Sequence, residues 1–156
     1  MKRPLAAAPS RAALYLRVST VRQGEEGQSL EVQEARCRAS ASAKGAESVA
    51  IYRDEYSGRS AQRPGLRRLV ADIEAGAVNR VIVYKLDRAF RSIRDFFTFE
   101  AICEKHNVAF ISATEDIDTS TAAGKLQRTM LAALAQFYSD LLSERMKDSM
   151  DARARA

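Results

Sequence analysis

The sequence predicts an α/β domain with a mainly parallel sheet of roughly four strands, flanking helices and a long C-terminal helix. Three observations support this fold class. Short apolar segments alternate along the chain with longer segments that are bounded by helix-capping residues. The segment Val81–Tyr84 is apolar throughout, as expected of a strand that is covered on both faces. The length of 156 residues is sufficient for one such core.

The first strand and helix are predicted from residue alternation and from two capping residues. Leu14–Val18 places its apolar side chains on one face, which is typical of a strand. The polar, glycine-containing segment 23–28 is expected to form a loop. Ser29 favours the N-terminal end of a helix and Gly45 its C-terminal end. A second strand is expected at Val49–Tyr52.

The second helix and the third strand follow a polar segment. Asp54–Gln62 is expected to be a loop. Pro64 favours the first helical position and Gly76 the residue after the last, so these two residues bound the second helix. The apolar run Val81–Tyr84 is then the third strand.

One further strand and two helices complete the prediction. Ser92 and Asp95 form a capping-box pattern at the start of a helix that ends near His106 and Asn107. After it we expect a fourth strand at Val108–Ile111 and an acidic loop at Ala113–Thr121. One long helix is expected from about Ala122 onward.

Positive charge is concentrated in the first part of the chain. Up to Asp95 there are 18 lysines and arginines against 11 acidic residues, whereas from Phe96 onward there are 7 against 9. A one-sided excess of arginine is typical of a protein that binds a polyanion. A solvated basic surface is the alternative explanation of the charge alone.

Composition argues against several other classes of protein. No apolar run approaches the ~20 residues of a membrane-spanning helix. The basic start of the chain has too short an apolar stretch for a signal peptide and is interrupted by Pro9, so we expect residues 1–12 to form a disordered leader. Cys37 and Cys103 are the only cysteines, which argues against a disulfide scaffold or a cysteine-based zinc site. A reducing, cytoplasmic location is expected.

Polar residues follow each predicted strand, and in a parallel sheet these positions converge on one edge. They combine one serine with basic and acidic residues: Ser19; Arg53 and Asp54; Lys85, Asp87, Arg88 and Arg91; Thr114, Glu115 and Asp116. Guanidinium groups bind phosphate oxygens in a bidentate manner and stabilise a pentacoordinate phosphate while a hydroxyl attacks in line. The pattern therefore predicts a phosphate site with a serine that can attack it.

Other common chemistries lack their residues. The only histidine, His106, falls at a predicted helix end away from this edge, which argues against a Ser-His-Asp hydrolase. The acidic residues of the edge are scattered and no histidine-rich set exists, which argues against a catalytic metal. Gly124 and Lys125 do not belong to a P-loop, because Thr119 stands where the first glycine is required and Leu126 where serine or threonine is required.

Five blocks of the sequence together resemble the serine site-specific recombinases, the family of resolvases, invertases and large serine integrases. They follow the family's order between about Ala13 and Arg145: Tyr15-Leu16-Arg17-Val18-Ser19-Thr20; Gln28-Ser29-Leu30 with Gln33; Asp54-Glu55-Tyr56-Ser57-Gly58 with Arg63-Pro64-Gly65-Leu66; Lys85-Leu86-Asp87-Arg88 with Arg91-Ser92; and Ala135-Gln136-Phe137 with Ser143-Glu144-Arg145. Phe137 and the long loop at 23–28 are more similar to the large integrase or transposase branch. Tyr138 and Ser139 stand where small resolvases often carry Glu and Arg.

The resemblance implies roles for individual residues. Ser19 is implied to be the nucleophile that forms a 5′-phosphoserine bond to cleaved DNA. The other implied positions are Arg17, Arg63, Arg88 and Arg91 around the phosphate, Asp87 in positioning or proton transfer, Gln33 and Lys85 as supporting polar groups, and Arg145 on the long helix. The family acts on double-stranded DNA and needs no metal, nucleotide or small-molecule substrate.

Several residues also have a structural interpretation that the sequence leaves open. Asp54 fits a loop cap or a salt bridge as well as a site residue, and Tyr56 fits either stacking or packing. Four further arginines fit a solvated or phosphate-contacting surface better than catalysis: Arg59, Arg67, Arg68 and Arg94. Two other functions stay open, namely a non-catalytic DNA-binding regulatory module and a phosphoesterase or nuclease. A covalent bond between Ser19 and DNA would exclude both.

The long helix carries two apolar stripes. The first consists of Leu126, Met130, Leu134, Phe137 and Leu141, and the second of Leu131, Tyr138, Leu142 and Met146. Either stripe, or one wide stripe, fits packing on the subunit's own sheet. By resemblance, residues 13–121 are expected to form the catalytic domain. Residues 122–156 are then an oligomerisation helix of a homodimer or tetramer that leads toward DNA-binding domains after Ala156.

Overall fold

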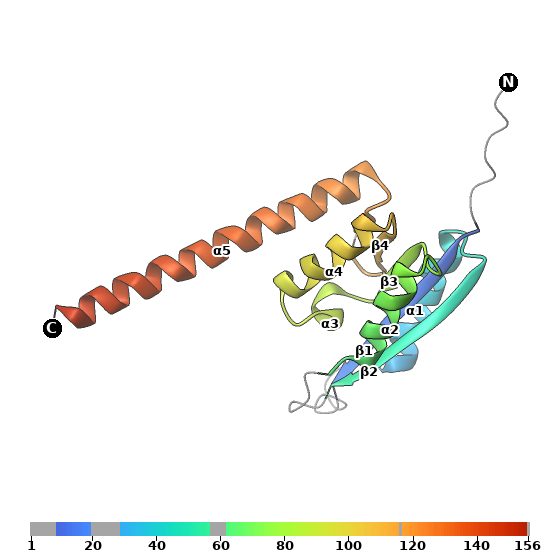
Figure 1. Cartoon of the computed structure of the whole chain (residues 1–156), viewed down its shortest axis with the longest axis horizontal. Helices are drawn as coiled ribbons and strands as arrows, with labels where there is room; N and C mark the ends of the chain where they lie inside the picture. Colours follow the sequence, from blue (N-terminus) through green and yellow to red (C-terminus); the bar gives the residue numbers. More distant parts are fainter. Residues whose placement is uncertain (1–8, 20–28, 57–61, 116, 156) are drawn as a thin grey trace, which may run out of the picture.

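Four parallel strands form one sheet in the order β2-β1-β3-β4 (Figure 1). The structure, a computed structural model, describes residues 9–19, 29–56, 62–115 and 117–155. The strands are β1 (Arg11–Ser19), β2 (Ser48–Tyr56), β3 (Arg80–Val83) and β4 (Ala109–Ser112). The helices are α1 (Leu30–Ala43), α2 (Pro64–Glu74), α3 (Leu86–Ala89), α4 (Ile93–Lys105) and α5 (Ala122–Ala154). The predicted α/β class with a long C-terminal helix is confirmed.

Different helices cover the two faces of the sheet. On one face, α1 packs on a cluster of buried residues: Ala12, Leu14, Leu16, Cys37, Ala41, Ile82 and Ile111. On the other face, α2 and α4 enclose a larger core, whose fully buried side chains include Tyr15, Leu69, Ile73, Phe96 and Phe110. Successive residues of a strand point to opposite faces. Leu14 and Leu16 therefore contact α1, whereas Tyr15 between them belongs to the core under α2 and α4.

The predicted helix ends are present in the structure. The side chains of Ser29 and Ser92 accept hydrogen bonds from the first turns of α1 and α4. Gly45 and Gly76 follow α1 and α2 with φ of 71° and 72°, in the left-handed region that favours glycine. His106 is the C-cap residue of α4, as expected.

Several expectations about the strands and helices need correction. β2 continues to Tyr56, so Asp54 and Glu55 belong to a strand rather than to the predicted loop. Their charges interrupt the apolar pattern, although Asp54 is buried. The short helix α3 had no sequence signal, because four residues are too few to show a helical period. β1 begins at Arg11, within the expected leader, and β3 ends at Val83. Residues 1–8, 23–28 and 57–61 lie outside the described part.

α5 projects away from the rest of the domain (Figure 1). Near its start, Leu131 packs against the core under α2 and α4, and Arg128 pairs with Glu100 of α4. Further along, its large apolar side chains are exposed: Leu134, Phe137, Tyr138, Leu142, Met146 and Met150. None of the helices in the described ranges, α5 included, has the length and apolar character needed to cross a membrane.

Candidate active site

The chain leaves the two central strands toward opposite faces of the sheet. β1 is followed by α1 on one face, whereas β3 is followed by α3 and α4 on the other (Figure 1). In open α/β sheets, ligands bind in the crevice beyond the carboxyl ends of two such strands. The edge to which the sequence assigned the site therefore coincides with the switch point between β1 and β3.

β1 reaches this crevice with Arg17 and Ser19. Arg17 follows Tyr15 by two residues, so it lies on the α2 and α4 side of the sheet, where it is half-buried. Ser19 is the last residue of the strand, and its backbone is paired with Tyr56 of β2. The side chains of Ser19 and Tyr56 lie outside the described residues, as do Thr20 and Gln28. The structure thus brings the backbone of the predicted nucleophile to the crevice, two residues from an arginine.

Asp54 is buried at the end of β2 and stabilises the N-terminal end of α2. Its carboxylate accepts hydrogen bonds from the backbone N–H groups of Gly65 at 2.6 Å and Leu66 at 2.9 Å, and from the Tyr15 hydroxyl at 2.9 Å. Negative charge is favourable at a helix N-terminus. A Cβ on Gly65 would lie 2.5 Å from the carbonyl oxygen of Arg53, so glycine permits this close approach. Asp54 is a cap, although of a helix rather than of a loop.

The Tyr15 hydroxyl is a neutral donor within this group. Burial, and then the charge of Asp54 and the hydrogen bond to it, raise the pKa of Tyr15 well above its usual value. The charges of Arg63 and Arg17 act in the opposite direction because they stabilise the phenolate. Both arginines are therefore electrostatic neighbours of the pair formed by Tyr15 and Asp54, at the carboxyl end of β1.

Arg63 connects the start of α2 with the start of α4. Its guanidinium Nη1 lies 2.7 Å from Oδ2 of Asp95, and its side chain is only 11% exposed. The same Asp95 oxygen accepts the backbone N–H of Arg91 at 3.1 Å. The Asp95 N–H is in turn capped by Ser92. The carboxylate of Asp95 thus contacts two predicted phosphate ligands, through the guanidinium of Arg63 and the backbone N–H of Arg91.

α3 is anchored on its apolar side and presents its polar side chains outward. Leu86, Ala89 and the following Phe90 are at most 9% exposed. The Phe90 ring centroid lies 5.5 Å from that of Phe96 and 5.4 Å from that of Phe99. The polar residues of this segment are consequently left at the surface, with Arg88 half-buried and three others exposed: Lys85, Asp87 and Arg91.

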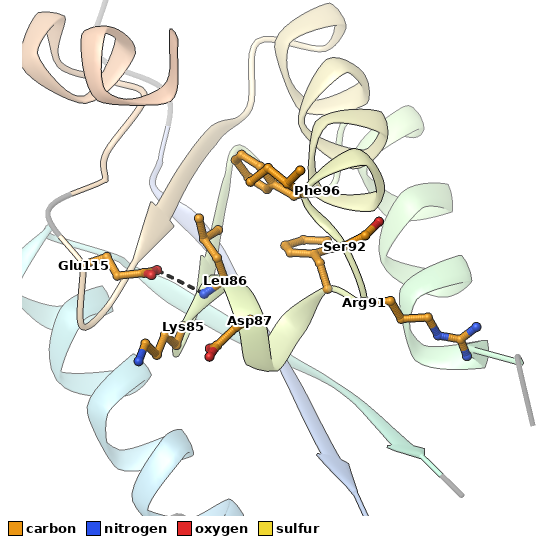
Figure 2. A pocket seen from close by; sticks show the side chains of 9 residues that line it. Lys85, Leu86, Asp87, Arg91, Ser92, Phe96 and Glu115 are labelled. Atoms are coloured by element: carbon orange, nitrogen blue, oxygen red, sulfur yellow. Dashed lines mark hydrogen bonds between the residues drawn. The ribbon is translucent and has the colours of Figure 1, made fainter. Parts of the chain in front are cut away.

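A cavity of about 340 Å³ lies beside α3 (Figure 2). Its lining combines cations and carboxylates with apolar groups: Lys85, Asp87, Arg91 and Glu115 with Ser92, Leu86, Phe90, Ile93 and Phe96. An apolar hollow with a few convergent polar groups is typical of ligand sites. Three of the predicted site residues therefore meet at one cavity.

The other predicted site residues do not line this cavity, and two of them, Gln33 and Arg145, lie on other parts of the fold. Gln33 is buried in the first turn of α1. The other end of α1 lies beside the start of β3, where Arg80 donates to the carbonyl of Lys44 at 2.5 Å. Gln33 is thus near the carboxyl edge, but on the α1 face. Arg145 is exposed on the second half of α5, which projects from the domain (Figure 1), so the structure does not bring it to the crevice of its own subunit.

Cationic groups, rather than clustered metal ligands, characterise the described part of the crevice. Lys85 and Arg91 line the cavity, Arg88 lies on α3 beside it, and Arg17 and Arg63 are electrostatic neighbours of Tyr15. Within the described ranges, no group of three or more His, Cys, Asp or Glu residues could hold a metal ion. Several guanidinium groups at one place are suited to bind a phosphodiester and to stabilise charge on its oxygens.

The contacts that hold the site together were missed by sequence reasoning. Tyr15 was expected only as a strand residue, Asp95 only as a cap, and Glu115 only as one acid of the edge. Their partners lie far away in the chain, such as Asp54 for Tyr15 and Arg63 for Asp95. Tyr15 carried the one available signal, because a tyrosine in a buried strand needs a polar partner for its hydroxyl.

Residues 12–156 match the protein family described as the resolvase N-terminal domain. The chain is 33% identical over 138 residues to a DNA-invertase of Escherichia phage P1, which covers 88% of this chain and 67% of that protein. It is 35% identical over 133 residues to the transposon Tn552 resolvase of Staphylococcus aureus, with coverages of 84% and 61%. The chain thus spans about two thirds or less of the length of these relatives.

Two solved structures are similar over most of their length. The N-terminal catalytic domain of TP901-1 integrase matches with a TM-score of 0.74 and 42% identity, covering 85% of this chain and 98% of that one. A resolvase family site-specific recombinase from Streptococcus pneumoniae matches with a TM-score of 0.74 and 28% identity, with coverages of 94% and 99%.

Proposed function

The chain belongs to the resolvase family of serine recombinases, which are DNA strand-exchange enzymes, and from this premise we propose that it cleaves and rejoins double-stranded DNA through a covalent bond between Ser19 and a 5′ phosphate. The observation that carries the proposal is the convergence of cationic side chains at the carboxyl ends of β1 and β3. Arg17 and Arg63 are electrostatic neighbours of Tyr15, α3 carries Arg88, and Arg91, which follows α3, lines the cavity beside that helix.

In the proposed cleavage step, the Ser19 hydroxyl oxygen attacks the phosphorus of the scissile phosphodiester in line with the 3′ oxygen. The new bond joins Ser19 to the 5′ phosphate, while the bond from phosphorus to the 3′ oxygen breaks. The serine proton passes to a base, and the 3′ oxygen leaves as a hydroxyl after it receives a proton. Because one phosphoester replaces another, attack by a 3′ hydroxyl reverses the step and needs no nucleotide.

The arginines have a shared role in this proposal. Arg88 lies on α3, Arg91 follows that helix and lines the cavity, and Arg63 precedes α2 and pairs with Asp95 of α4. Guanidinium groups stay charged and form paired hydrogen bonds with phosphate oxygens, so they stabilise the charge of the pentacoordinate state. Asp87, exposed on the same helix, is assigned to positioning or to proton transfer. Lys85 and Gln33 are supporting polar groups.

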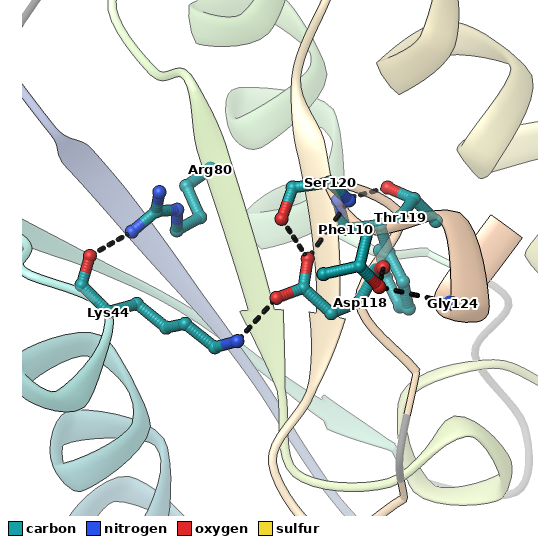
Figure 3. Close-up of polar contacts among 8 residues, drawn as sticks. Lys44, Arg80, Phe110, Asp118, Thr119, Ser120 and Gly124 are labelled. Carbon is teal, nitrogen blue, oxygen red and sulfur yellow. Dashed lines mark hydrogen bonds and ion pairs between the residues drawn. The ribbon is translucent and has the colours of Figure 1, made fainter. Parts of the chain in front are cut away.

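We propose that α5 also joins two or more copies of the chain. Its start is fixed to the domain, because Asp118 accepts hydrogen bonds from Lys44 at 2.5 Å and from the Ser120 N–H at 2.9 Å (Figure 3). A Cβ on Gly124 would lie 1.8 Å from the Asp118 carbonyl oxygen, so the first turn packs tightly there. Beyond Leu131 most of the large apolar side chains of the helix are exposed. A homodimer or tetramer would bury them and place Arg145 near a DNA strand.

The remaining expectations follow from the same proposal. The substrate is DNA rather than a small molecule, and no bound cofactor is assigned. A cytoplasmic location fits an enzyme that acts on DNA and has two free, buried cysteines, Cys37 and Cys103. Residues 13–121 are assigned to catalysis and residues 122–156 to assembly.

The proposed function is tested with the protein as it is expressed from its gene and sheared genomic DNA of the source organism. DNA that stays on the protein through detergent denaturation measures the covalent intermediate. The wild type is expected to retain DNA, also in EDTA, whereas Ser19→Ala should bind DNA without retaining it after denaturation. Ser42→Ala, at an exposed serine of α1, is the matched control and should behave as the wild type.

Two results would contradict the proposal. Equal amounts of adduct from Ser19→Ala and the wild type would show that another residue attacks the phosphate. Cleaved DNA that carries free 5′ phosphates and no protein would instead indicate a nuclease that uses the same arginines.

A further inference from the structure

The short helix α3 begins without a side-chain cap of its own. Lys85, its N-cap residue, makes no capping hydrogen bond with its side chain. The N–H groups of Arg88 and Ala89 bind the Lys85 carbonyl, and that of Phe90 binds the Leu86 carbonyl. The N–H of Leu86 precedes these donors, and the first N–H groups of a helix need acceptors from elsewhere.

Glu115 supplies this acceptor from the segment between β4 and α5. Its Oε2 accepts the Leu86 N–H at 3.0 Å, as Figure 2 shows. The same oxygen accepts the hydroxyl of Ser112 at 2.8 Å, and Ser112 is buried at the end of β4. The carboxylate is therefore held between the end of one strand and the beginning of the helix that follows another.

Two neighbouring hydrogen bonds extend this contact. The Ala113 N–H donates to the Val83 carbonyl at 2.8 Å, and the Thr114 hydroxyl donates to the Tyr84 carbonyl at 2.8 Å. Together with Glu115, three consecutive residues after β4 bind the connection between β3 and α3. The start of α3, the helix that carries Arg88, is thus held by the segment that leads to α5.

We propose that Glu115 is a positioning residue for the DNA cleavage step, an inference that rests on the proposed function. Glu115 lines the same cavity as Lys85, Asp87 and Arg91, but its Oε2 already accepts two hydrogen bonds. It acts through α3, by fixing where the polar side chains of that helix stand around the phosphate. A displacement of a catalytic group by about 1 Å costs on the order of 100-fold in rate.

The test compares two substitutions of Glu115 in the single-turnover rate of Ser19–DNA adduct formation. Glu115→Ala removes the acceptor and should lower the rate about 10- to 100-fold, with DNA affinity unchanged within about threefold. Glu115→Gln keeps an oxygen that can accept both hydrogen bonds and should retain most of the rate. Glu74→Ala removes an exposed acid at the end of α2 and is the matched control.

A second variant keeps the proposal testable if Glu115→Ala does not fold. Ser112→Ala removes the hydroxyl that holds the carboxylate and should lower the rate in the same direction, by a smaller factor. Where both substitutions fold, adding Ser112→Ala to Glu115→Ala should cause no further loss, because both remove one contact.

The outcomes separate this role from the function on which it rests. A wild-type adduct with an equal rate in Glu115→Ala would overturn the positioning role and leave the proposed function standing. Equal losses in Glu115→Ala and Glu115→Gln, or a loss of DNA affinity that accounts for the loss of rate, would also overturn it. No adduct from the wild type would overturn the proposed function and the positioning role with it.

Discussion

At the residue scale, buried polar groups and close backbone contacts determine how the crevice is held. Asp54 is only 4% exposed, and its carboxylate accepts three hydrogen bonds. A buried carboxylate needs such donors, because burial removes its contacts with water. The three donors come from β1 and from the start of α2. The carboxylate thereby joins the strand that ends at Ser19 to the helix that begins after Arg63.

Glycine is required at position 65 for the close contact between the start of α2 and the end of β2. In Gly65→Ala the added methyl group would meet the Arg53 carbonyl oxygen at 2.5 Å and Asp54 Oδ1 at 2.9 Å. We predict that the free energy of unfolding falls by about 1–3 kcal/mol, as for other overpacked sites. Urea denaturation measures the change, with Arg67→Ala on the exposed side of α2 as the control. Equal stability of the two variants would show that α2 can move away from β2.

Arg88 tests whether the geometry of the cation matters in addition to its charge. Arg88→Lys keeps the positive charge but loses the planar fork that binds two phosphate oxygens. We predict a loss in cleavage rate on the order of 100-fold or more. Arg38→Lys, at an exposed arginine of α1, is the control in the same single-turnover assay. A rate near that of the wild type would show that Arg88 does not contact the phosphate.

The two cysteines predict how stability depends on pH. Burial raises the pKa of the Cys37 and Cys103 thiols from 9.0 to about 12. Between these values the unfolded chain has lost protons that the folded chain keeps, so the free energy of unfolding falls as pH rises. Below about pH 8 these thiols cause almost no change, because they are protonated in both states. Urea denaturation from pH 7 to 10 measures this, and native thiols that react at pH 8 as fast as unfolded ones would contradict it.

At the element scale, α3 and α5 depend on contacts made by other parts of the chain. α3 is too short to be stable alone, and both its apolar side and its first N–H group are bound by neighbours. α5 is long, but its tertiary anchor lies in its first turns, where Gly124 approaches Asp118 and Leu131 enters the core. Most of its other large apolar side chains are exposed.

The structure decides which apolar stripe of α5 belongs to the core near its start, because Leu131 packs there whereas Leu134 and Phe137 are exposed. Burying each such side chain in a dimer is worth roughly 1.5–3 kcal/mol. We predict that Leu134→Gln with Phe137→Gln gives a folded monomer, and that Leu131→Gln destabilises the domain. Sedimentation equilibrium measures the oligomeric state of each variant, and circular dichroism measures whether it is folded. A monomeric wild type at high concentration would show that the interface lies elsewhere.

At the scale of the whole molecule, local patterns were sufficient to predict the order of elements and the edge that carries the site. The apolar run at Val81–Val83 predicted the buried strand β3, and Ser92 predicted the start of α4. The structure of a residue could not be predicted where it depends on partners that lie far away in the chain. Asp54 interrupts an apolar pattern, and its place within β2 depends on donors that only the folded chain brings to it.

The candidate site follows the same division. The positions after β1 and β3 were predictable, because parallel strands bring their carboxyl ends to one edge. The ion pair between Arg63 and Asp95 and the hydrogen bond from Leu86 to Glu115 were not predictable. Neither spacing nor composition indicates a contact between distant segments. The family resemblance supplied the order of the blocks, and it left open how α3 is held in place.

The central claim is that Ser19 joins the 5′ end of cleaved DNA, and mass spectrometry of the trapped adduct tests it most directly. The adduct is recovered under denaturing conditions and digested with a protease and a nuclease. The account predicts one peptide that contains Ser19 and carries a nucleotide through its 5′ phosphate, together with free 3′ hydroxyl ends on the DNA. A nucleotide on another residue, a linkage to the 3′ end, or cleaved DNA without any attached peptide would contradict it.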